Sequence, residues 1–300
     1  MRTLFFLFSV FIFTQNLFCE QGVDGCQEDN NMSIEFSGAF EFTEDQVKDY
    51  HNKPSNNAQE IRKIIESGFF GNSKEILDVG CGEGRLTALF AANLPHTSIV
   101  GCDVSKTMIE YALRHHVSSN LSFIEMNAEN LDFQQKFDTV ISFSCLHWVR
   151  NQKRVISQIF NVLKPGGKAL LVATPASSNN DFKTVCSKVI LSFRWLPYFL
   201  TFRSVHSFHT EQEYKKLLMD TGFLIDKIQI NPTKLTFKNR DELEPFLKAV
   251  LTPLQHLHPS NQPAFLEDFF QELIKQGKVD ADGSIHIFFD QIELLVSKNI

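Results

Sequence analysis

The sequence predicts an α/β fold in which helices cover both faces of a mostly parallel sheet. Short apolar strands alternate with helical patterns between residues 58 and 173, and the first strand runs directly into a glycine-rich turn. Parallel strands joined by crossover helices produce this alternation. Because ligands bind at the carboxyl ends of such strands, we expect the binding site beside the glycine-rich turn.

The first strand and its turn lie in residues 76–84, which read Ile-Leu-Asp-Val-Gly-Cys-Gly-Glu-Gly. Asp78 lies near the end of the strand, and Gly80, Gly82 and Gly84 follow at alternate positions. Glycines let the backbone approach a ligand closely, and the helix expected next presents its N-terminus there. The G-x-G-x-G spacing differs from the G-x-G-x-x-G of dinucleotide-binding enzymes.

Four more strands follow, at residues 98–102, 121–124, 137–143 and 169–173. Asp103 follows the second strand about 20 residues after the glycines, where an acidic residue binds ribose hydroxyls. An ionised carboxylate accepts strong hydrogen bonds from such hydroxyls. Helical patterns separate the strands, at residues 58–67, after the N-cap Ser105 and over 155–162.

The pattern changes after residue 174. Residues 176–181 are expected to form a loop, and residues 193–202 carry many large apolar side chains. Helices are predicted over 210–221, where Thr210 and Glu213 form a capping box, after Asn239, and over 263–276. Strands are predicted over 223–230 and 284–296.

Taken in order, several segments resemble the class I S-adenosylmethionine-dependent methyltransferases over about residues 58–223. They are the glycine turn, Asp103, Asn127-Ala128, the run from Ser144 to Trp148, and Pro165-Gly166-Gly167. The resemblance implies a Rossmann-like, doubly wound sheet of seven strands. That sheet is mostly parallel and ends in an antiparallel pair formed by the last two predicted strands, with helical insertions in the C-terminal half.

The resemblance implies S-adenosyl-L-methionine as cofactor, held by Asp78, Gly80, Gly82, Gly84, Asp103, Val104, Met108, Asn127, Ala128 and Ser144. His147 would lie near the transferred methyl group, where it takes a proton, positions an acceptor oxygen, or only holds its own loop. Trp148, Trp195 and Tyr198 are assigned to the acceptor side. The cysteine spacing suits neither a zinc cluster nor a disulfide scaffold, and no metal is expected.

The run Cys145-Leu146-His147-Trp148-Val149 is similar to that of the trans-aconitate and juvenile hormone acid methyltransferases, which methylate carboxylates of small acids. The first hypothesis is therefore O-methylation of a small-molecule carboxylate, and the segment 193–202 suits an apolar acid. The alternatives are methylation of a hydroxyl or carbon of a lipid, quinone or secondary metabolite, and a non-catalytic cofactor-binding module. A net charge of −6 argues against a nucleic-acid partner.

The N-terminal region is a separate question. Residues 1–20 match a secretory signal, with Arg2 before an apolar core too short to span a membrane. Residues 21–40 are interpreted as a linker, and residues 41–300 as one methyltransferase domain with a cofactor-binding core at 58–175 and substrate-side elements at 176–300. The alternatives to export are translation from Met32, which predicts a cytoplasmic protein, and an uncleaved anchor.

Overall fold

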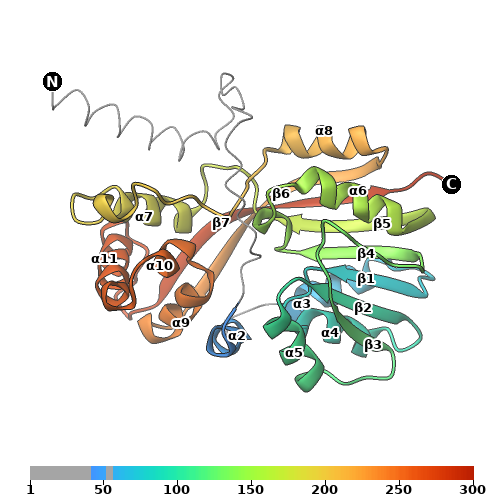
Figure 1. Cartoon of the computed structure of the whole chain (residues 1–300), viewed down its shortest axis with the longest axis horizontal. Helices are drawn as coiled ribbons and strands as arrows, with labels where there is room; N and C mark the ends of the chain where they lie inside the picture. Colours follow the sequence, from blue (N-terminus) through green and yellow to red (C-terminus); the bar gives the residue numbers. More distant parts are fainter. Residues whose placement is uncertain (1–41, 52–56) are drawn as a thin grey trace.

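The computed structural model describes residues 42–51 and 57–300, so the expectations for residues 1–40 lie outside the described residues. Its sheet has seven strands in the order β3-β2-β1-β4-β5-β7-β6 (Figure 1). The strands β1 to β5 are mutually parallel, and β7 is antiparallel to both β5 and β6. The predicted fold class is confirmed. The strands are β1 Glu75–Val79, β2 Ser98–Asp103, β3 Leu121–Glu125, β4 Phe137–Phe143, β5 Leu163–Ala173, β6 Leu224–Phe237 and β7 Ile285–Ser297.

Helices cover both faces of this sheet. Side chains alternate between the faces along each strand, so Leu77 packs in a cluster with α6 and α8 whereas Ile76 packs with α3 and α4. The predicted caps are confirmed: the Ser105 Oγ accepts from the Met108 backbone N–H, and Thr210 with Glu213 forms a capping box. The helices are α2 Glu44–His51, α3 Asn57–Glu66, α4 Arg85–Asn93, α5 Lys106–His115, α6 Gln152–Val162, α7 Asp181–Ile190, α8 Glu211–Thr221, α9 Arg240–Val250, α10 Thr252–His256 and α11 Gln262–Lys275.

The strands β6 and β7 form a long two-stranded ribbon. β7 pairs with β5 only from Ile292 to Ser297, whereas it pairs with β6 along its whole length, out to Phe237 opposite Ile285. The prediction that β6 ends at residue 230 was wrong. β6 continues through Asn231-Pro232 to Phe237, because it is an edge strand of the sheet, where proline is tolerated.

The far part of the ribbon carries a second apolar core. The helices α7, α9, α10 and α11 gather around it (Figure 1), and we call this part the helical lobe. Trp195, Phe199, Phe237, Phe265 and Phe269 are fully buried there. The helix α7 and the short α2 were not predicted. Within the described residues, no helix is long and apolar enough to cross a bilayer.

Candidate active site

The glycine turn after β1 has the backbone geometry that its sequence requires. The φ angles are +74° at Gly80, +55° at Gly82 and +82° at Gly84, where side chains are disfavoured. A Cβ atom on Gly80 would lie 2.4 Å from Cys145, and one on Gly84 would lie 2.6 Å from Phe123. At Gly82 it would meet nothing within 4 Å. Two glycines therefore let the turn pack closely, and the middle one faces open space.

Asp103, at the end of β2, lies beside this open space. Its Oδ2 accepts a hydrogen bond from the Gly82 backbone N–H at 2.9 Å, and its Oδ1 accepts one from the Ser105 backbone N–H at 2.9 Å. A carboxylate can accept about four hydrogen bonds. The two backbone donors therefore fix the orientation of the carboxylate at the edge of this open space.

Asp78, in β1, is buried and is hydrogen-bonded to the helix that follows the turn. Its side chain is 2 % exposed, and its Oδ2 accepts a hydrogen bond of 2.7 Å from the Thr87 hydroxyl on α4. Burial raises the pKa of the Asp78 carboxyl to about 7, although the Thr87 hydrogen bond opposes this rise. Asp78 is thus placed to hold the turn against α4.

The remaining residues assigned to the cofactor fall into two groups. Val104 is 37 % exposed, and the exposed Asn127 accepts a hydrogen bond from the Glu129 backbone N–H at 2.8 Å. The structure brings both to the same sheet edge as Asp103. Met108 and Ala128 are buried in the core behind that edge.

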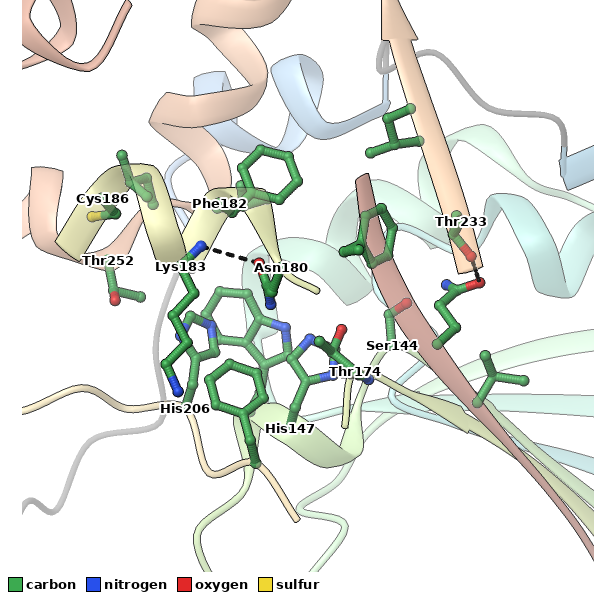
Figure 2. A pocket seen from close by; sticks show the side chains of 18 of the residues that line it. Ser144, His147, Thr174, Asn180, Phe182, Lys183, Cys186, His206, Thr233 and Thr252 are labelled. Carbon is green, nitrogen blue, oxygen red and sulfur yellow. Dashed lines mark hydrogen bonds between the residues drawn. The ribbon is translucent and has the colours of Figure 1, made fainter. Parts of the chain in front are cut away.

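A large cavity begins where β4 ends. Its volume is about 760 Å³, and it extends from Ser144, His147 and Trp148 to the ribbon and the helical lobe (Figure 2). Ser144 has a φ of +56° and is the one non-glycine residue with positive φ in residues 42–51 and 57–300. Strained residues of this kind concentrate at functional sites. Here the strain turns the chain sharply into a short 3-10 helix, Leu146–Trp148.

His147 lines this cavity as an uncharged ring. Burial, and secondly the neighbouring His206, lower its pKa to about 3. The Thr174 backbone N–H, 3.3 Å from His147 Nδ1, donates to it. Because Nδ1 is the acceptor, the neutral ring carries its proton on Nε2. In this state the Nε2–H of His147 can donate a hydrogen bond.

Aromatic rings surround His147. Its ring stacks on Phe208 with centroids 6.1 Å apart, and His206 lies 4.3 Å from the Trp148 ring centroid. Burial lowers the pKa of His206 to about 4, so this second imidazole is also neutral at pH 7.

Much of the cavity lining was not predicted from the sequence. His206 and Phe208 come from the connection between α7 and α8, and the opposite wall comes from α7 and the ribbon (Figure 2). One signal was available, because residues 182–210 contain four lysines and arginines, seven aromatic residues and no aspartate or glutamate.

Trp195 and Tyr198 lie elsewhere than the sequence analysis expected, because neither lines the cavity. Trp195 is 2 % exposed, packs against Phe265 with centroids 5.2 Å apart, and donates from Nε1 to Asp268 at 2.6 Å. Tyr198 is 49 % exposed. Periodicity could not separate a core aromatic residue from a cavity residue in this interrupted segment. Phe202, a few residues later, does line the cavity.

Comparison with known proteins agrees with this geometry. A family model described as a methyltransferase domain matches residues 76–167. The juvenile hormone acid O-methyltransferase of Bombyx mori is 32 % identical over 207 residues, which are 66 % of this chain and 72 % of that protein. A malonyl-[acyl-carrier protein] O-methyltransferase of Priestia megaterium is 26 % identical over 223 residues, 72 % of this chain and 79 % of that protein.

Solved structures share the fold. The phosphoethanolamine N-methyltransferase 2 of Haemonchus contortus superposes with a TM-score of 0.56 and 19 % identity, over 86 % of this chain and 58 % of that chain. The cyclase SpnF superposes with a TM-score of 0.53 and 17 % identity, over 85 % of this chain and 93 % of that chain. The fold alone therefore does not define the reaction.

The identity to the Bombyx enzyme supports the assignment more strongly than the shared fold does, because it extends over 72 % of that protein. The chain belongs to the S-adenosylmethionine-dependent methyltransferases.

Proposed function

We propose that this enzyme methylates a carboxylate oxygen of a small, apolar acid. The observation that carries the proposal is the combination, in one cavity, of apolar walls, positive charge and neutral imidazoles. We further propose that residues 41–300 form one catalytic domain.

The residues at the open side of the glycine turn fit the cofactor. Gly82 leaves space, the Asp103 carboxylate is the residue type that binds ribose hydroxyls, and Val104 with Asn127 borders the same edge. When bound there, S-adenosyl-L-methionine supplies a methyl group on a sulfonium. Ser144 lines the cavity, and the next residue, Cys145, packs against Gly80 of the glycine turn. The cofactor edge and the acceptor cavity are therefore adjacent.

The charge of the cavity favours an anionic acceptor. Five of its described lining side chains are lysines or arginines, at positions 63, 150, 183, 203 and 234. The one carboxylate in that lining, Glu293, pairs with Lys227 at 2.8 Å. A cleft of one charge sign with low-dielectric walls concentrates ligands of the opposite charge.

The two imidazoles favour a nucleophile that is already ionised. A carboxyl with a pKa near 4 needs no base at pH 7. A hydroxyl needs a base whose pKa is close to the working pH, whereas the pKa of His147 is about 3 and that of His206 about 4. The neutral His147 Nε2–H can instead donate to one carboxylate oxygen and orient the other toward the methyl group. Correct positioning can supply roughly 7–11 kcal/mol of a barrier.

The relatives support the same chemistry. The Bombyx mori relative is named for an acid acceptor, and the Priestia megaterium relative is an O-methyltransferase of a malonyl group. Apolar walls formed by Phe143, Phe182, Phe246, Val250 and Phe289 suit an acceptor with a hydrocarbon body.

The test is a matched pair of acceptors with the same hydrocarbon skeleton, one ending in a carboxylate and the other in a primary alcohol. The full chain is incubated with each acceptor and methyl-labelled S-adenosyl-L-methionine. We expect label on the acid only, in a product from which alkali releases methanol, as it does from an ester. Label on the alcohol, or label on the acid that resists alkali, would contradict the proposal.

A further inference from the structure

Asn180, the N-cap residue of α7, presents hydrogen-bond donors to the acceptor cavity. It is 9 % exposed and lines the cavity, and its Oδ1 accepts a hydrogen bond of 3.0 Å from the Lys183 backbone N–H. Because that N–H needs an acceptor, the amide oxygen is fixed at this bond, and Nδ2 with its two donors points to the other side. Figure 2 shows Nδ2 directed toward the part of the cavity where His147 lies.

The Nδ2 donors of Asn180 have no protein partner in the described part of the chain. No group within residues 42–51 and 57–300 accepts a hydrogen bond from them. Buried side-chain donors normally have a partner, because a buried donor without one costs free energy. A bound molecule with an oxygen at this point would supply that partner.

Hydrogen bonds to the ribbon fix the position of Asn180. Its backbone pairs with Phe289 of β7. Just before it, the Ser177 hydroxyl and Asn179 Nδ2 donate to the two carboxylate oxygens of Asp290, at 2.7 Å and 2.6 Å. The donors of Asn180 are therefore held in place before an acceptor binds, which lowers the entropic cost of binding.

Asn180 and His147 are held along the same side of β7. The Thr174 backbone N–H, which donates to His147 Nδ1, directly follows Ala173, and Ala173 pairs with Ile292 of β7. Asn180 pairs with the residue three positions before Ile292. Three residues of an antiparallel strand span roughly 10 Å. The two side chains therefore reach the cavity from backbone positions close enough for one small acceptor to contact both.

The charges around Asn180 favour an anion. The N-terminus of α7, a helix of 10 residues, carries a partial positive charge. The neighbouring acid Asp181 pairs with Lys278 at 2.8 Å and accepts from the Phe288 backbone N–H at 2.7 Å, and it does not line the cavity. A protonated amine would bring further N–H donors to a point where Asn180 already offers donors only.

We propose that Asn180 determines acceptor specificity, because its Nδ2–H groups donate to the anionic group of the acceptor and offer nothing to a cationic one. His147 and Asn180 then bind the acceptor from two different elements, the turn after β4 and the N-terminus of α7. That the anionic group is the carboxylate to be methylated rests on the proposed function, whereas the selection of an anionic ligand by Asn180 does not.

The test exchanges the donors of Asn180 for acceptors without removing the helix cap. Asn180→Asp does this, because aspartate caps a helix as well as asparagine does. The matched control is Asn239→Asp, since Asn239 Oδ1 accepts a bond of the same 3.0 Å length at the start of α9 and Asn239 does not line the cavity. Octanoate and octylamine, which share one carbon skeleton, are titrated into the full chain by calorimetry at pH 7 and saturating S-adenosyl-L-homocysteine.

We expect Asn180→Asp to weaken octanoate binding about tenfold or more, because repulsion between two negative charges replaces a hydrogen bond to a charged group. Octylamine binding should become tighter, which a merely structural defect would not produce. Asn239→Asp should bind both ligands like the parent, and both variants should keep the parent's Tm because both caps are retained. Weaker binding of both ligands, or unchanged octanoate binding by Asn180→Asp, would overturn the inference.

Calorimetric titration needs no turnover, so the role of Asn180 and the proposed function can fail separately. A parent that methylates no acid, together with opposite affinity shifts in Asn180→Asp, would refute the proposed acceptor and leave Asn180 as the selector of anionic ligands. A parent that methylates an acid, together with unchanged octanoate binding by Asn180→Asp, would refute the role of Asn180 and leave the proposed function standing.

Discussion

Replacement of His147 distinguishes a hydrogen-bond donor from a general base. His147→Ala removes both capacities, whereas His147→Gln keeps an N–H donor on a side chain that cannot take up a proton. A hydrogen bond to a charged group contributes roughly 1.5–3 kcal/mol. At about 1.4 kcal/mol for each factor of ten, His147→Ala should lose roughly ten- to hundredfold in kcat/KM, and His147→Gln should recover part of that loss.

The same reasoning also predicts how the rate depends on pH. With a pKa of about 3, His147 stays neutral across the working range, so the parent rate should be flat between about pH 6 and pH 8. Both variants should show the same flat profile at lower rates. The assay is transfer of labelled methyl to the best acid at saturating cofactor.

One pattern of results would refute this reasoning. In it, the parent rate rises through a pKa between 6 and 8, and both variants lose that rise together with about a hundredfold or more of rate. His147 would then act as a base, and the acceptor would be a hydroxyl or a carbon acid.

Three further predictions concern the rest of the fold. Gly82→Arg should abolish cofactor binding in calorimetric titration while Gly82→Ala keeps most of it, because a Cβ there meets nothing within 4 Å; equal losses would show that backbone strain alone is responsible. Trp195→Ala should cost about 3–5 kcal/mol in denaturant unfolding, whereas Tyr198→Ala should change stability by less than about 0.5 kcal/mol and leave KM unchanged. Because the pKa of Asp78 is raised from 3.8 to about 7, the folded protein binds more protons than the unfolded chain between these values, and stability falls as pH rises through them. As the pH rises from about 5 to about 8, the Tm of Asp78→Asn should therefore fall less than the Tm of the parent. Two plots of Tm against pH with the same slope would contradict the raised pKa.

The parallel half of the fold could be predicted because its signals are local. The glycines after β1 need positive φ, and Ser105 and Thr210 cap helices through hydrogen bonds within a few residues. These patterns depend on neighbours in sequence, so one sequence is enough to recognise them.

The acceptor side depends on contacts between distant segments. The His206 ring packs against the Trp148 ring, although the two residues are 58 positions apart in the sequence. The low pKa of His147 likewise follows from tertiary packing, which no local sequence pattern reveals. Trp195 and Phe202 are both aromatic residues of the apolar segment 193–202, yet Trp195 is buried in the core whereas Phe202 lines the cavity. Such assignments need tertiary structure.

The ribbon of β6 and β7 allows the size of the acceptor cavity to change independently of the cofactor site. β7 leaves the sheet next to Ile292, and the cavity residues Asn231, Thr233 and Gln291 lie at that departure point. A small bend there would swing the helical lobe and resize the acceptor cavity, while the glycine turn after β1, four strands away from β6 in the sheet order, would stay in place. Acceptor size can therefore vary among such enzymes without a change in how the cofactor is held.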